Sequence, residues 1–136
     1  MTTDGSRRWI VPFVLAPVLG LLSLILPVIG SPRRVPAPLF PLVATGVKHM
    51  SLATLGLLFS SGVVLGGAFG GRTPWAASFV VFAAMPFIIL AEVIVDPTSH
   101  NLFPFELLMY GALSLMTLAG SGIGMLVRRR LLREPR

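Results

Sequence analysis

Long apolar stretches separated by short polar segments dominate this sequence. Each stretch holds about 20 residues, the number that an α-helix needs to cross the hydrocarbon core of a bilayer. Backbone groups in that core must bond within their own segment, and the alternation typical of a transmembrane β-barrel is missing, so helices are predicted. They cover residues 9–29, 50–69, 75–95 and 105–127. The sequence therefore predicts an all-α fold with a single domain, an integral membrane four-helix transmembrane bundle.

The composition supports a lipid environment. Hydrophobic residues make up 54% of the chain and charged residues 12%, against roughly 25% charged residues in soluble domains. Cysteine is absent, which excludes disulfides, thiolate metal sites and cysteine nucleophiles. The net charge of +6 would suit nucleic acid, but the basic residues flank apolar stretches and do not interleave with aromatic residues on a polar face. No nucleic-acid binding is predicted.

The distribution of basic residues predicts the orientation, because cytoplasmic loops of membrane proteins are enriched in Lys and Arg. If the N-terminus is cytoplasmic, the inner side carries Arg7, Arg8, Arg72, Arg128, Arg129, Arg130, Arg133 and Arg136. The outer side then carries Arg33, Arg34 and Lys48. We therefore expect a multi-pass protein of a cell membrane, of the bacterial inner-membrane kind, with both termini cytoplasmic. The first apolar stretch exceeds the roughly 7–15 residues of a signal peptide and is predicted to be retained.

The connections differ in character. Prolines exclude a continuous helix over residues 30–49, yet residues 35–43 are apolar. We expect this connection to lie on the membrane surface or to fold back over the bundle. Residues 70–74 predict a tight turn that makes the second and third helices antiparallel neighbours. The basic tail, 128–136, is expected to anchor the topology and to contact the lipid bilayer. Aromatic residues near the membrane interfaces are typical of aromatic belts: Trp9, Trp75 and Tyr110.

Small residues and prolines mark the helices. Glycine pairs spaced by four include Gly62/Gly66, Gly66/Gly70 and Gly120/Gly124. Such pairs allow close backbone approach between membrane helices. Packing within the chain is the favoured interpretation; association into a homo-oligomer or a larger membrane complex through the same faces is the alternative. Pro12, Pro17 and Pro27 in the first helix and Pro86 in the third are expected to remove backbone hydrogen bonds and bend these helices.

Most of the titratable chemistry lies in one polar segment, residues 92–106. Glu92 and Asp96 are four residues apart and share a helix face, where two carboxylates repel unless a cation or a shared proton intervenes. The cations on the same predicted side of the membrane are Arg33, Arg34 and Lys48. The favoured interpretation is a structural clamp, in which these outer bases pair with the outer acids.

Three alternatives remain for this segment. The acids and imidazoles could bind a cation, a small ligand or a divalent metal; the candidates are Glu92, Asp96, His100, Glu106 and His49. His49 and His100 could instead bind a haem or contact a quinone. Because these alternatives stay open, the sequence identifies neither a cofactor nor a metal. Glu106 also has a structural explanation, because an acid in the first turn complements the positive end of a helix.

Two functions follow from these patterns. The first is a non-enzymatic accessory or assembly subunit of a membrane complex, favoured by the small size, the glycine-rich faces and the lack of a charge at mid-membrane depth. The second is a membrane protein that binds a cation or small ligand at the outer acidic and histidine residues, for transport or catalysis. No catalytic residue is assigned, and an enzyme is the less favoured class.

Overall fold

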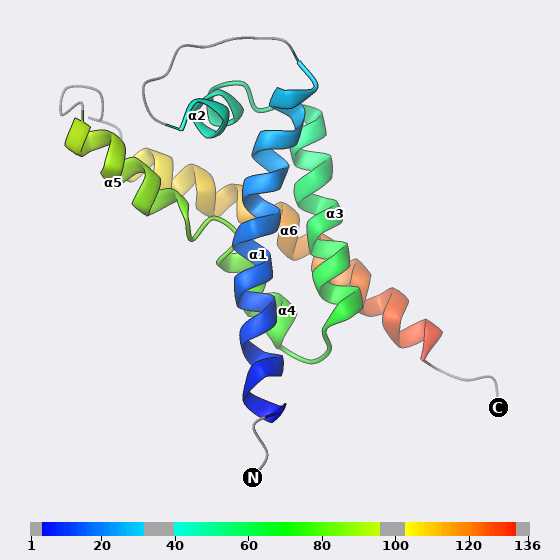
Figure 1. Cartoon of the computed structure of the whole chain (residues 1–136). Coiled ribbons are helices and arrows are strands. Elements are labelled where there is room, and N and C mark those ends of the chain that lie inside the picture. Colours follow the sequence, from blue (N-terminus) through cyan, green and yellow to red (C-terminus); the bar gives the residue numbers. More distant parts are fainter. Residues whose placement is uncertain (1–3, 32–39, 96–102, 133–136) are drawn as a thin grey trace.

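A computed structural model describes residues 4–31, 40–95 and 103–132 of the chain. Within these ranges every regular element is a helix (Figure 1). In chain order they are α1 (Asp4–Ile29), α2 (Pro41–Lys48), α3 (Leu52–Ala68), α4 (Thr73–Phe79), α5 (Met85–Val95) and α6 (Phe103–Leu131). The all-α prediction is confirmed for the part of the chain that the structure describes.

Two of these helices are long and apolar enough to cross a membrane, α1 over Ile10–Ile29 and α6 over Pro104–Leu131. A third span results if α2 and α3, which are bent by 105° at their junction, are counted as one. At a rise of about 1.5 Å per residue, α3 is roughly 26 Å long and α5 only about 17 Å, against a hydrocarbon core of about 30 Å. The structure is thus compatible with a membrane location and supports two or three crossing helices.

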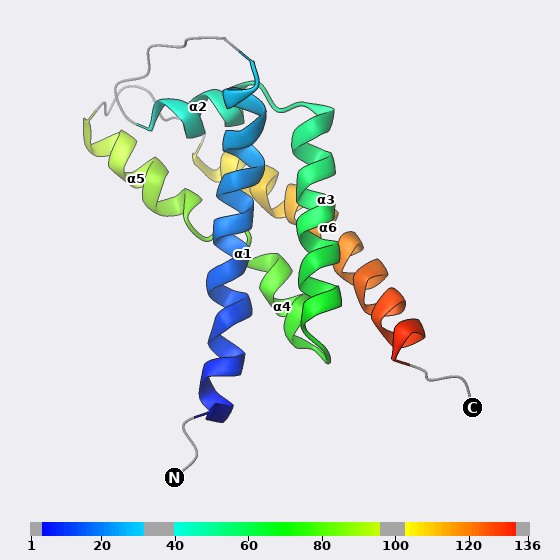
Figure 2. The ribbon, with the colours of Figure 1, turned by 45° about the vertical axis from the view of Figure 1, so that its right-hand side comes forward.

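The predicted helix over residues 75–95 is not continuous. It consists of two separate helices, α4 and α5, joined by an irregular segment (Figures 1 and 2). Between them the amides of Ala83 and Met85 bond three residues back, to Val80 and Phe82, both at 2.9 Å. Pro86 has no N–H to continue the four-residue pattern, and in a continuous helix its ring would clash with the Phe82 carbonyl group. The expected bend at Pro86 is therefore a break.

The first part of the break, Val81 and Phe82, is buried, and Val81 lies against α1. Val81 is 1% exposed, and its carbonyl oxygen lies so close to Gly20 that a Cβ atom there would overlap it. Irregular backbone at membrane depth is tolerated only where protein covers it. Gly20 allows α1 to provide that cover.

The tightest helix contact joins α3 and α6 through glycine. A Cβ on Gly62 would overlap the Thr117 carbonyl oxygen, and one on Gly120 would overlap that of Phe59. The other two glycines of these pairs make the same kind of contact: Gly66 and Gly124. The two predicted pairs Gly62/Gly66 and Gly120/Gly124 therefore face each other within one chain, and Gly70 instead lies beside the guanidinium group of Arg128.

Serine hydroxyls join α6 to α3 and to α4 in the interior. Ser121 donates to the Gly62 carbonyl oxygen at 3.2 Å and lies 2.7 Å from the Ser78 hydroxyl, which also reaches the Pro74 carbonyl oxygen at 2.8 Å. Each of the two hydroxyl groups has one proton to donate, so only two of these three hydrogen bonds form at the same time. A second serine pair, Ser23 and Ser61 at 3.3 Å, joins α1 to α3.

α2 covers the end of α1. Gly46 lies against the Leu24 carbonyl oxygen, and Val43 is buried among core residues of α1, α3 and α5. The sequence predicted no helix here, although it did expect this apolar segment to fold back over the bundle as one of two options. Pro41 suits the start of α2, because the first helical amide has no partner inside a helix. The remainder of the proline-rich connection, residues 32–39, lies outside the described residues.

The connections alternate between two ends of the molecule. The start of α1, the turn between α3 and α4, and the end of α6 lie towards one end (Figures 1 and 2). α2, the end of α5 and the start of α6 lie towards the other. We call these the arginine end, after Arg72 and Arg128–Arg130, and the acidic end, after Glu92 and Glu106.

Candidate functional site

A cavity of about 270 Å³ lies at the acidic end, where α2, α5 and α6 meet. Its polar lining comes from Lys48 of α2, Glu92 of α5, and Glu106 and Tyr110 of α6. The apolar lining is Val43, Ala44, Val47, Met85, Ile88 and Ile89. We call it the acidic cavity.

Local structure explains how each polar group reaches this cavity. Lys48 is the last residue of α2, and the bend that follows keeps α2 across the end of the bundle. Glu92 stands in the last turns of α5, one turn after Ile89, which is 3% exposed and part of the core. Glu106 lies in the first turn of α6, where a carboxylate complements the positive helix end.

Tyr110 forms the inner wall. It follows Glu106 by four residues and therefore lies on the same face of α6. Its side chain is 6% exposed, and its ring packs on Phe82 with centroids 5.2 Å apart and planes tilted by 37°. The prediction that Tyr110 belongs to an aromatic belt at the membrane surface is wrong, because the ring is buried in the core beside the helix break.

The acidic cavity contains two carboxylates and one ammonium group. Glu92 and Glu106 are both half-buried, whereas Lys48 is exposed. With all three ionised, the lining carries one net negative charge. Such a lining attracts a cation, and burial of the carboxylates strengthens that attraction because surrounding apolar side chains lower the local dielectric constant.

The predicted site residues are only partly brought together. Glu92, Glu106 and Lys48 share the acidic cavity. His49 lines a different cavity of about 360 Å³, between α1, α2 and α3, with Thr45, Ser51 and Thr54. Asp96 and His100 lie outside the described residues, as do Arg33 and Arg34.

No metal centre is formed by the described residues, among which no three His, Asp or Glu side chains come together as a ligand set. The haem or quinone hypothesis needed His49 and His100, and only His49 is described. Ligand binding and a structural clamp both stay predictions, and the shared lining of Lys48, Glu92 and Glu106 is the observation relevant to each.

Sequence reasoning missed two participants. Tyr110 could have been found from its spacing to Glu106, which places both on one helix face. The apolar lining from α2, beside the predicted Lys48, could not be found, because no local pattern indicates where a short helix after a proline-rich connection docks. Comparison with protein-family models, curated proteins and solved structures gives no match for this chain.

Proposed function

We propose that this chain is a non-enzymatic, multi-pass protein of a bacterial-type inner membrane that acts as an accessory or assembly subunit of a membrane complex. In this proposal α1, the bent α2–α3 pair, the broken α4–α5 pair and α6 make four crossings. The arginine end is cytoplasmic, in keeping with the enrichment of basic residues on that side of membranes. The acidic cavity then faces outward.

The exposed apolar surface of α5 carries the subunit proposal. α5 is too short to cross a bilayer alone, and its large outward side chains are uncovered: Phe87 is 74% exposed and Ile94 73%. At the start of α6 two further large apolar side chains are exposed, Phe105 at 68% and Leu108 at 70%. A short helix with an uncovered apolar surface gives a partner a place to bind.

Site-specific photo-crosslinking tests this proposal. A benzophenone amino acid replaces Phe87 on α5 or, as a control, Val14 on α1, which is 59% exposed. We expect a discrete protein adduct from position 87, absent from position 14, and a stoichiometric partner after purification in a mild detergent. A monomer that forms lipid adducts alone at both positions would contradict the proposal.

A second candidate function is favoured by the acidic cavity, which suits a small cation. Binding of Na⁺, Mg²⁺ and ethanolamine to the purified full chain is measured by the shift in its melting temperature. Glu92→Gln and Glu106→Gln are expected to abolish the shift from whichever cation stabilises the parent chain. Glu134→Gln, in the basic tail, removes the same charge as a control. Equal shifts in all variants, or none in the parent chain, would exclude cation binding here.

The structural clamp gives a different result in the same assay. If Lys48 pairs with Glu106, Lys48→Met and Glu106→Gln each lower stability and their double variant loses little more, because the second change removes nothing further. Strictly additive losses would argue against the pair. The clamp and the cation site are thus separated by a double-mutant cycle and a ligand shift.

A further inference from the structure

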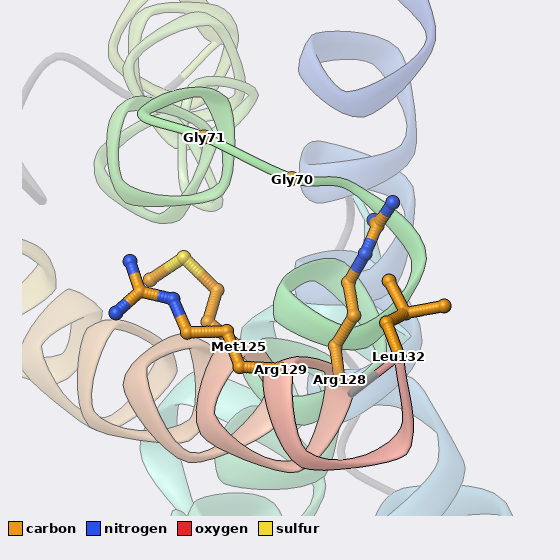
Figure 3. A pocket seen from close by; sticks show the side chains of 6 residues that line it. All are labelled: Gly70, Gly71, Met125, Arg128, Arg129 and Leu132. Carbon is orange, nitrogen blue, oxygen red and sulfur yellow. The ribbon is translucent and has the colours of Figure 1, made fainter. Parts of the chain in front are cut away.

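A larger cavity, of about 510 Å³, lies at the arginine end between the turn that joins α3 to α4 and the last turns of α6. It is lined by Gly70, Gly71, Met125, Arg128, Arg129 and Leu132. Figure 3 shows the side chain of Arg128 extending from α6 towards the chain at Gly70, whereas that of Arg129 extends along α6 in a different direction, beside Met125. Its volume falls within the roughly 300–1,000 Å³ of small-molecule sites. We call it the arginine cavity.

The two guanidinium groups differ in their contacts. Arg128 donates from Nη1 to the Ala68 carbonyl oxygen at 2.9 Å, and its Cζ lies 3.4 Å from where a Cβ on Gly70 would stand. It therefore complements the negative end of α3 and is held in place. Arg129 is exposed and lines the same cavity, which leaves its fork of N–H donors open to an anion.

The opposite wall is backbone. Gly71 has a φ of 75°, in the left-handed region, and Arg72 follows with φ −89° and ψ −13° in the right-handed region. Successive residues of opposite hand point their amide groups to one side and form an anion-binding concavity. A Cβ at Gly71 would meet nothing within 4 Å, so an anion has room to approach the turn.

We propose that the arginine cavity binds a phosphate group, contacted by the guanidinium groups of Arg128 and Arg129 that line the cavity and by the amides of the turn at Gly71 and Arg72. Paired N–H donors of arginine match phosphate oxygens in geometry as well as charge. Met125 and Leu132 give the cavity apolar walls beside the basic groups. This combination suits the headgroup of an anionic phospholipid, although a soluble phosphate compound has the same chemistry.

Native mass spectrometry of the full chain in a neutral detergent tests this site. The probes are phosphatidylglycerol, phosphatidylcholine and inorganic phosphate, added separately. Arg129→Gln removes a charge from the cavity lining, whereas Arg130→Gln removes the same charge from the next residue, which does not line it. Both positions are exposed, and equal melting temperatures of the two variants establish that folding is unaffected.

We expect one tightly bound phosphatidylglycerol per chain, with affinity reduced about tenfold by Arg129→Gln and less than twofold by Arg130→Gln, because a charge-assisted hydrogen bond is lost only in the first. The same variant dependence with inorganic phosphate would assign the site to a soluble ligand and still support phosphate binding. Equal weakening by both variants, or no binding of either anionic probe, would overturn the proposal, since the arginines would then act only as a diffuse charge.

Discussion

The backbone contact between α3 and α6 makes the firmest stability prediction. Gly62 of α3 lies against the Thr117 carbonyl oxygen of α6, and a Cβ there would overlap it. The substitution Gly62→Ala must push the two helices apart locally. Gly56, on the same helix, has nothing within 4 Å of its Cβ position, and Gly56→Ala is therefore the matched control.

Two opposing effects determine how much each substitution changes the free energy of unfolding. Alanine improves the helix propensity of either position by up to about 1 kcal/mol. At Gly62 this gain is outweighed, because overpacking a tight interface costs about 1–3 kcal/mol. Separation also weakens the 3.2 Å bond from Ser121 to the Gly62 carbonyl oxygen, and side-chain bonds between membrane helices contribute about 0.6 kcal/mol on average. The free energy of unfolding should fall by about 1–3 kcal/mol in Gly62→Ala and stay equal or rise in Gly56→Ala.

Unfolding of both variants in mixed micelles, as a function of the mole fraction of a denaturing detergent, measures this difference. The parent chain is unfolded under the same conditions for reference. If Gly62→Ala is as stable as Gly56→Ala, the helices do not approach through glycine, and the account of the interior fails.

Three further predictions concern buried groups. The hydroxyl of Thr117 is buried and has no hydrogen-bond partner among the described residues, so Thr117→Val should raise the free energy of unfolding by about 1 kcal/mol; a loss of stability would reveal a partner. A double-mutant cycle of Ser78→Ala and Ser121→Ala should show a coupling energy of about 0.6 kcal/mol, and additive effects would contradict the 2.7 Å contact. Gly20→Ala should lower the free energy of unfolding by about 1–3 kcal/mol, because its Cβ meets the Val81 carbonyl oxygen; an unchanged value would mean that α1 does not cover the break.

The sequence predicts some helices of this fold well, because the length and composition of an apolar stretch are enough to indicate them. α1 and α6 are long apolar helices with charged residues near their ends. α6 begins just before Glu106, which the sequence places in the first turn of a helix. The facing glycine pairs of α3 and α6 also follow from spacing alone, although spacing does not say whether the partner is the same chain.

Other features depend on contacts that no local pattern encodes. Pro86 predicts a bend, but hydropathy is as high across residues 80–84 as on either side, so it does not indicate that one helix ends at Phe79 and the next begins at Met85. The break depends on a Val81 carbonyl group covered by Gly20, residues 61 positions apart in the sequence. The acidic cavity likewise needs α2, whose docking on α1 decides which acids Lys48 can approach.

The proposed orientation of the helices in the membrane can be measured by cysteine labelling, because the chain has no cysteine of its own. Four single-cysteine variants of exposed positions, Ser31→Cys, Arg72→Cys, Val95→Cys and Leu132→Cys, are treated in intact cells with a membrane-impermeant maleimide. The account predicts that the cysteines at positions 31 and 95 react from outside, whereas those at positions 72 and 132 react only after the membrane is opened. Labelling of position 72 or 132 in intact cells, or protection of position 95, would contradict the four crossings and the outward acidic cavity.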